Sequence, residues 1–219
     1  MKKQQREVKI YSPEEERINV ISHAAGFFFS LAATVALVWH SALHGTVWHV
    51  VSFAIFGASL MLLYAASTCY HRASVPEVRR RLKVFDHASI YVLIAGSYTP
   101  FTLVTLHGTL GWVIFGLAWG AALTGVILKL FFTGRYNRLS TIMYVVMGWV
   151  IVFAIKPLLA HLSGEGVFWL IAGGVAYTVG ALIYSLKKIR FNHAIFHLFV
   201  LLGSVCHFAA VMFYVLPLP

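Results

Sequence analysis

The feature that most constrains this sequence is a series of seven long apolar runs separated by short loops. Crossing the hydrocarbon layer of a membrane as a helix takes roughly 20 largely apolar residues. The predicted spans cover residues 20–40, 49–70, 86–106, 110–131, 141–160, 166–186 and 194–216. Lipid offers no hydrogen-bond partners to backbone groups, and the runs lack the alternating polarity of barrel strands. The sequence therefore predicts an all-α integral membrane protein, a bundle of seven transmembrane helices.

The composition argues against a soluble protein. Only 11% of the residues are charged and 60% are hydrophobic, whereas about a quarter of the residues in an ordinary soluble domain are charged. The polar stretches between the runs are too short for a second folded unit. We therefore expect one transmembrane domain over residues 20–219, after a basic cytoplasmic tail over residues 1–19. Within the fourth span, Gly116 and Gly120 form a GxxxG pattern, which favours close packing inside the bundle over dimerisation.

The basic residues predict the orientation of the bundle. Of the 17 lysine and arginine residues, all except Lys156 fall at one end of the predicted helices, and positively charged segments collect on the cytoplasmic side. We therefore expect a cytoplasmic N-terminus and an external C-terminus. The same segments explain the net charge of +10 through contact with anionic lipid head groups. Nucleic acid is not expected as a partner, because it would require a solvated basic face with stacking aromatic residues.

Polar side chains from three spans share one predicted depth, close to the cytoplasmic face. His71 closes the second span, Asp86 opens the third, and His193 and His197 open the seventh. By this interpretation Asp86 is the only one of the seven acidic residues that lies inside a span. An ionisable group inside a span indicates a functional site, because burying it without a partner is costly. The simpler alternative is an ion pair between Asp86 and a nearby basic residue such as Lys83.

The spacing of these residues predicts a metal site. His193 and His197 are four residues apart and share one helix face, with Cβ atoms about 5–6 Å apart. Ser67 and His71 share a face of the second span in the same way. Three imidazole ligands are typical of catalytic zinc sites, which leave the fourth position to water. Imidazole also suits copper and iron, so zinc is only weakly favoured. A lone histidine pair near a helix end is more often interfacial polarity, and it is the combination of three helices that favours a metal.

Three polar residues of the first span are placed at the same level. Glu16, Asn19 and His23 follow a spacing of three and then four residues and so share one helix face. They could orient a ligating histidine, or they could form a purely structural hydrogen-bond network. His207 lies about 15 Å along the helix from His197, which is too far to bind the same ion. We expect His207 to make an interhelical hydrogen bond instead.

Several stretches of the sequence resemble the hemolysin III family of bacterial membrane proteins. They are "ASTCYH", "FDHASIYVLIAGSYTPF", "NHAIFHLFVLLGSVCHF" and "EERINVISH". The family is related to the adiponectin and progestin receptors and to alkaline ceramidases, a superfamily of suspected or demonstrated membrane metal-dependent hydrolases. The resemblance covers essentially the whole chain and implies a location in a bacterial cytoplasmic membrane. It also implies that His71, His193 and His197 bind zinc, with Ser67 and Asp86 beside the metal.

Three hypotheses about function follow. In the first, zinc activates water to attack a lipid amide or ester, Asp86 handles the proton and Ser67 stabilises the oxyanion, in a role in membrane lipid homeostasis. In the second, the protein is a zinc-stapled sensor or receptor without enzymatic activity, with Asp86 as a fourth ligand. In the third, it is a cytolytic pore, although the outer halves of the spans contain few residues that would line one. The sequence does not select the class of lipid.

Overall fold

The computed structural model describes residues 11–133 and 137–217. The regular structure in this part of the chain is entirely helical, and seven helical segments are long and apolar enough to cross a membrane. The predicted all-α bundle with seven spans is therefore confirmed. Most of the predicted basic tail, residues 1–10, lies outside the described residues, as does the connection at residues 134–136.

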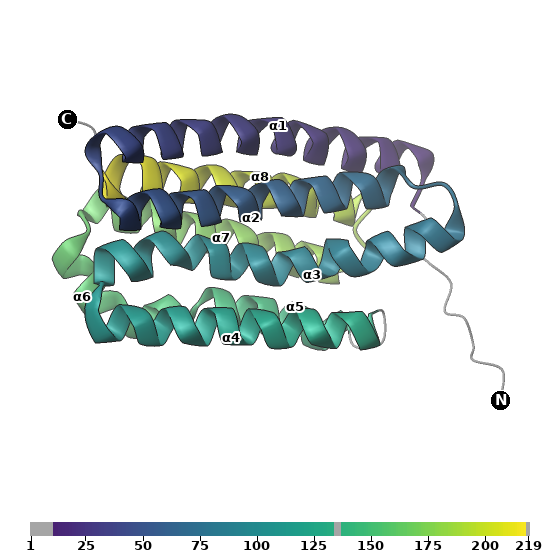
Figure 1. Cartoon of the computed structure of the whole chain (residues 1–219). Helices are drawn as coiled ribbons and strands as arrows, with labels where there is room; N and C mark the ends of the chain where they lie inside the picture. Colours follow the sequence, from purple (N-terminus) through teal and green to yellow (C-terminus); the bar gives the residue numbers. More distant parts are fainter. Residues whose placement is uncertain (1–10, 134–136, 218–219) are drawn as a thin grey trace.

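The helices lie side by side, with α1, α2 and α8 on one side of the bundle and α4 and α5 on the other (Figure 1). The first four spans are α1 (Pro13–His44), α2 (Val47–Arg72), α3 (Pro76–Pro100) continued by the π-helix η1 (Phe101–Leu106), and α4 (Gly108–Phe132). The last three are α5 (Asn137–Gly148) with the 3₁₀-helix η2 (Val150–Ala154) and α6 (Ile155–His161), then α7 (Gly164–Ser185), and α8 (Asn192–Ala210) with the π-helix η3 (Val211–Val215).

The first helix begins seven residues before the predicted span, at Pro13. The Ser12 side chain caps it by accepting a hydrogen bond from the Glu15 amide at 3.3 Å, and proline suits the first helical position because its missing N–H needs no partner there. Three acidic residues in the first turn also stabilise the helix, because their negative charges lie near the positive end of the helix dipole. Because α1 begins this early, Glu15 and Glu16 are part of the helix and precede the apolar run.

The fifth span is not the single helix that its hydropathy predicts. It ends as α5 at Gly148, continues as η2 and resumes as α6. Pro157 has no N–H to donate to the carbonyl four residues earlier, so regular α-helix is disfavoured in the preceding turn. The Tyr98 hydroxyl donates to the Met147 carbonyl at 2.7 Å and accepts from the Ile151 amide at 3.0 Å. Backbone groups at the break are thus paired by a side chain of α3.

The packing face of α4 differs from the one expected from its GxxxG pattern. A Cβ atom on Gly116 or Gly120 would meet no other atom within 4 Å, and both residues are exposed. The prediction that this pair packs inside the bundle is therefore wrong. The buried face of α4 instead contains Ala118, Ala122 and Gly125, and a Cβ on Gly125 would come within 2.5 Å of the Tyr91 ring. Because α4 lies at the side of the bundle, only this face meets a neighbouring helix.

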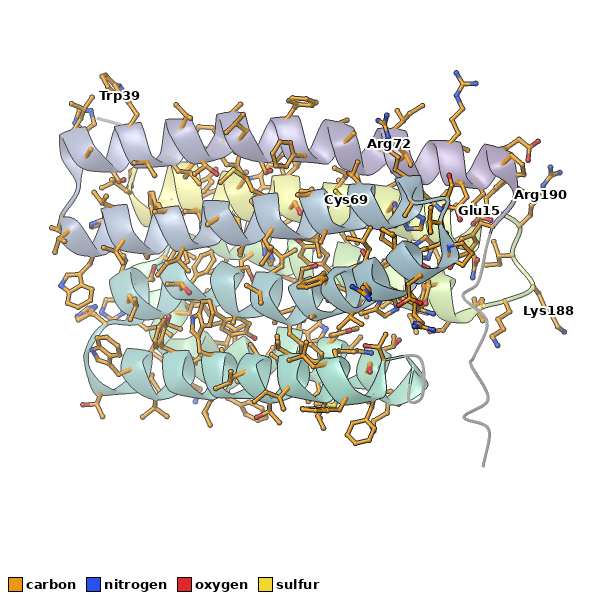
Figure 2. The ribbon with its side chains drawn as sticks, turned by 45° about the vertical axis from the view of Figure 1, so that its right-hand side comes forward. Glu15, Trp39, Cys69, Arg72, Lys188 and Arg190 are labelled. Carbon is orange, nitrogen blue, oxygen red and sulfur yellow. The ribbon has the colours of Figure 1, made fainter. Side chains whose placement is uncertain are left out.

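The two ends of the bundle differ in charge. Figure 2 shows Glu15, Arg72, Lys188 and Arg190 toward the end where α1 begins, and Trp39 at the other end. We call these the basic end and the opposite end. The basic end also contains the ends of α2, α4 and α7 and the starts of α3 and α8. It is therefore the end at which the predicted site residues are expected to meet.

Candidate metal centre

Three histidine side chains converge inside the basic end. His71 lies in the last turn of α2, and His193 and His197 lie in the first two turns of α8. The Nε2 atom of His193 is 3.0 Å from Nε2 of His71 and 3.0 Å from Nε2 of His197. Within the described residues, these three form the only group of three or more histidine, cysteine or acidic side chains placed to hold a metal ion, with ligand atoms within 4.8 Å of one another. All three residues are buried.

The ring orientation of His71 is set by an acidic residue of α1. The Oε2 atom of Glu16 lies 2.7 Å from Nδ1 of His71. A carboxylate can only accept a hydrogen bond, so Nδ1 carries the hydrogen and the lone pair of Nε2 faces the other histidines. The Asn19 amide nitrogen lies 3.4 Å from the same Nδ1 atom. The helix face predicted from the spacing of Glu16 and Asn19 therefore does face the cluster.

The other two rings also have oxygen atoms at Nδ1. The Ser22 hydroxyl donates to the Asn19 carbonyl at 3.1 Å, which leaves its oxygen to accept from Nδ1 of His197 at 3.5 Å. The Tyr11 hydroxyl lies 3.0 Å from Nδ1 of His193. Burial raises the pKa of Tyr11 above its usual value, so this hydroxyl stays neutral and its oxygen can accept. His23 stacks on His197 with ring centroids 3.5 Å apart.

This arrangement fits a bound metal ion. With hydrogens at Nδ1, the three imidazoles direct Nε2 lone pairs at one another at close range, and such lone pairs repel unless a cation lies between them. Metal-ligating histidines characteristically donate their other N–H to a carboxylate, carbonyl or water. Glu16 provides that partner for His71 here. The residues present can therefore hold a metal ion through three nitrogen ligands.

Arg79 is a buried residue of the site that the sequence did not single out. Its guanidinium donates to the carbonyls of Tyr70, His71 and Ala73 at 3.4, 3.3 and 3.2 Å, where α2 ends. It also forms an ion pair with Glu16. Arg79 thus pairs the free carbonyls at the end of α2 and holds the carboxylate that orients His71. The available signal was its position two helical turns before Asp86, on the same face of α3.

A largely apolar cavity adjoins the histidines. Its volume is about 160 Å³, against the roughly 10–15 Å³ that one water molecule requires. Ser67, Asp86 and His23 line it at the basic end, and Leu158 and Leu170 line it further along the bundle. It therefore offers polar groups beside His193 and His197, and its lining is otherwise mainly apolar.

Asp86 and Ser67 lie in the wall of this cavity, as the predicted site requires. The Asp86 carboxylate lies 3.3 Å from Nδ1 of His87, and it is not one of the three grouped ligands. Among described residues, no hydrogen-bond partner is found for the buried Ser67 hydroxyl oxygen. Both polar groups thus remain next to the three histidines without being part of the ligand set. The roles assigned to them from the sequence stay predictions.

The third histidine of α8 lies apart from the cluster. Nε2 of His207 bonds to the carbonyl of Leu170, on α7, at 3.2 Å. The predicted interhelical hydrogen bond is confirmed. A Cβ on Gly173 would overlap the His207 ring, so the absence of a side chain at Gly173 is what lets the two helices approach.

The fold and the site together define a multi-pass helical membrane protein with a buried three-histidine cluster at one end. The family described as "Haemolysin-III related" matches residues 11–208, and the chain belongs to it. Hemolysin-3 of Bacillus cereus is 47% identical over 204 residues, 93% of each chain. The Hemolysin-3 homolog of Bacillus subtilis (strain 168) is 46% identical over 210 residues, 96% of this chain and 99% of the relative. The protein is therefore a multi-pass bacterial membrane protein.

More distant similarity extends beyond bacteria. The monocyte to macrophage differentiation factor of Homo sapiens is 27% identical over 209 residues, covering 91% of this chain and 84% of the relative. The heptahelical transmembrane protein 1 of Arabidopsis thaliana is 28% identical over 238 residues, covering 94% of this chain and 71% of the relative. These relatives agree with the superfamily that the sequence motifs indicated.

Proposed function

We propose that the three histidines bind zinc and that the protein is a zinc-dependent hydrolase of a lipid amide or ester, acting in membrane lipid homeostasis. One observation carries the proposal: three histidines form the ligand group, while Asp86 lies outside it in the wall of the adjoining cavity. Catalytic zinc sites have three protein ligands, whereas structural sites usually have four. The basic end would face the cytoplasm, by the positive-inside rule, and would contact anionic lipid head groups there.

The spacing of the nitrogen atoms supports zinc. Tetrahedral zinc with zinc–nitrogen distances of about 2.0–2.1 Å requires ligand nitrogens about 3.3–3.4 Å apart. Nε2 of His193 lies 3.0 Å from Nε2 of each of the other two histidines, and the three ligand atoms all lie within 4.8 Å of one another, so small movements of the rings would accommodate the ion. The Glu16 carboxylate at Nδ1 of His71 would also increase the basicity of that ligand.

The residues of the cavity wall provide the remaining chemistry. When bound, zinc lowers the pKa of water toward about 7. Asp86 would take a proton from the water molecule while the water oxygen forms a bond to the acyl carbon of the lipid. Ser67 would donate its hydroxyl hydrogen to the carbonyl oxygen as that oxygen becomes negative. Asp86 would then pass the proton to the departing nitrogen or oxygen as the bond to the acyl carbon breaks. The products would be a fatty acid and an amine or alcohol.

A zinc-stapled sensor without enzymatic activity is the second candidate. It is favoured by the way the histidines join α2 to α8, so that a metal ion would tie two helices together. The name of the Hemolysin-3 relatives suggests a pore-forming role, but the lining of the cavity does not favour it. The lining of the cavity is mainly apolar, with Leu158 and Leu170 among its members, and a conducting path would require a continuous polar lining.

The test is hydrolysis by the purified protein in lipid nanodiscs, screened by mass spectrometry against N-acyl and O-acyl lipids. We expect turnover that a chelator abolishes and that Asp86→Ala lowers by about 10²–10⁴-fold. Glu165→Ala is the matched control, because Glu165 is exposed in the first turn of α7, at the opposite end. Full turnover in Asp86→Ala would contradict the role of Asp86. Zinc-loaded protein that hydrolyses none of the lipids would favour the staple.

A further inference from the structure

The cavity has a second set of polar lining residues, which the proposed reaction does not use. Lys129 comes from α4, and Ser140, Thr141 and Tyr144 come from α5. None of them belongs to the helices that carry the three histidines. The cavity therefore receives polar groups from α4 and α5 in addition to those from α1, α2, α3, α7 and α8.

Lys129 is the unusual member of this set. It lies within a helix long and apolar enough to cross a membrane, and it is only 4% exposed. Lysines near the ends of membrane helices normally extend toward the interface and keep the ammonium in water. This small exposure shows that Lys129 does not do so. Its ammonium is turned into the bundle, toward the space beside Asp86.

The surroundings of the Lys129 ammonium do not neutralise it directly. In residues 11–133 and 137–217, no carboxylate lies within 4.0 Å of this nitrogen. The centroid of the Tyr144 ring is 5.9 Å from this nitrogen, and the charges of Lys83 and Asp86 act on it only at longer range. A buried charge without a close partner is costly, and inside a membrane span it indicates a binding site.

The chemistry of this region selects an anionic ligand. An ammonium pairs strongly with carboxylate and phosphate groups, and hydroxyls such as those of Ser140 and Thr141 are suited to the remaining oxygens of such a group. The rest of the lining is mainly apolar, with Ile94 and Val145 among its members. We infer that Lys129 and the α5 hydroxyls form a subsite for the carboxylate or phosphate of an anionic lipid whose chain fills the apolar cavity. As a statement about substrate, this rests on the proposed function. The hydrolysed lipid would carry an anionic group on its leaving part.

The test measures binding rather than turnover, and mass spectrometry checks that each probe is still intact at the end of the titration. The probes are two matched pairs with the same NBD-labelled acyl chain: the fatty acid against its methyl ester, and lysophosphatidate against monoacylglycerol. Each is titrated by fluorescence into the full-length protein in detergent, as purified. We expect at least one anionic probe to bind about tenfold or more tightly than its neutral partner, because a charge-assisted hydrogen bond contributes about 1.5–3 kcal/mol. Which pair shows the preference distinguishes carboxylate from phosphate.

Variants of two lysines test whether the charge of Lys129 itself causes the preference for the anionic probe. Lys129→Met should abolish the preference for the anionic probe, while Lys129→Arg should retain most of it. Lys156→Met is the matched control, since Lys156 is the exposed lysine of the fifth span at the opposite end, and the preference should be unchanged. Zinc content is measured on every variant. Thermal unfolding is followed in parallel, to show that each variant is folded.

Three results would overturn the inference. Equal binding of the anionic and neutral probes in both pairs would exclude an anion subsite. A preference that survives in Lys129→Met would place the anion elsewhere. A loss of zinc in folded Lys129→Met would show that the lysine supports the histidines rather than the ligand. If the preference is present but no lipid is hydrolysed, the subsite stands and only the hydrolase proposal fails.

Discussion

The two ends of the bundle contain the same histidine pattern with different outcomes. His193 and His197 at the basic end are four residues apart, and so are His40 and His44 at the opposite end. In the first pair the two Nε2 atoms are 3.0 Å apart and a third imidazole joins them. In the second pair the ring centroids are 5.1 Å apart, compared with 4.5 Å in the first pair. Nε2 of His40 is bonded to the carbonyl of Leu216 at 3.0 Å.

Two further histidines of the opposite end also pair with nearby backbone carbonyls. Nδ1 of His107 lies 3.3 Å from the carbonyl of Thr105, and Nδ1 of His161 lies 2.8 Å from that of Pro157. His44, His107 and His161 are exposed, so water can satisfy their other nitrogen atoms. Local carbonyls and water thus complete each ring separately. At the basic end, burial removes water, and Glu16 and Ser22 face Nδ1 of two of the rings. The difference teaches that an HxxxH pair is placed to hold a metal ion where Nδ1 has its own partner and water is excluded.

The largest effect should come from removing the α8 pair. We expect near-stoichiometric zinc in the wild type and loss of zinc in His193→Ala/His197→Ala, because two of the three ligands are gone. Elemental mass spectrometry on protein purified without chelator measures this. His40→Ala/His44→Ala has the same spacing at the opposite end and should keep its zinc. Zinc loss in both double variants, or in neither, would break the comparison between the two ends.

The next largest effect should come from Glu16. Replacing the carboxylate with an amide in Glu16→Gln removes the charged partner of His71, and such changes typically lower metal affinity by about 10–100-fold. Competition with a chromophoric zinc chelator measures the affinity. Glu14→Gln is the control, because Glu14 lies on the same helical turn but is exposed. An unchanged affinity in Glu16→Gln would mean that the ring of His71 is held by packing alone.

Arg79→Met should have a smaller effect on zinc and a clear effect on stability. The variant frees Glu16 and leaves the carbonyls at the end of α2 unpaired. Because Arg79 acts through Glu16, we expect the zinc affinity to fall by no more than about tenfold, together with a lower unfolding temperature. Arg80→Met, at an exposed neighbouring position, should change neither. Chelator competition and differential scanning fluorimetry give the two readouts.

The smallest effect should come from Tyr11→Phe. The substitution keeps the ring, whose centroid is 4.7 Å from that of His193, and removes only the hydroxyl at Nδ1. One neutral hydrogen bond contributes about 0.5–1.5 kcal/mol, so zinc affinity should fall about two- to tenfold. The same competition assay measures this. A loss of zinc affinity as large as that of Glu16→Gln would show that the Tyr11 hydroxyl and the Glu16 carboxylate contribute equally to zinc binding, and would contradict this prediction.

Much of the architecture could be predicted because membrane helices are specified by long apolar runs. The convergence of His71 with the α8 pair also followed, since helix ends of known polarity meet at one depth. Arg79 cannot be distinguished from Arg80 and Arg81 in the sequence, because the predicted third span begins only at Asp86 and all three arginines fall in the basic segment before it. Tyr11 precedes the first helix, and its contact with His193 depends on how that helix begins. Lys129 falls inside the predicted fourth span, at its basic end, but an apolar run does not show whether a lysine there extends to the interface or turns into the bundle.

The cap at Ser12 has a consequence for the order of assembly. By extending α1, it brings Glu15 against the backbone amide of His193, 178 positions later in the chain; Ser22 and His197 are separated by 175 positions. The first and last helices of the chain therefore meet at the histidines. During synthesis the ligand set cannot exist until α8 has been inserted and has docked beside α1. Metal loading would thus be the final event in the biogenesis of the protein, and chains that stop before the seventh span would be recognisable by their lack of the ion.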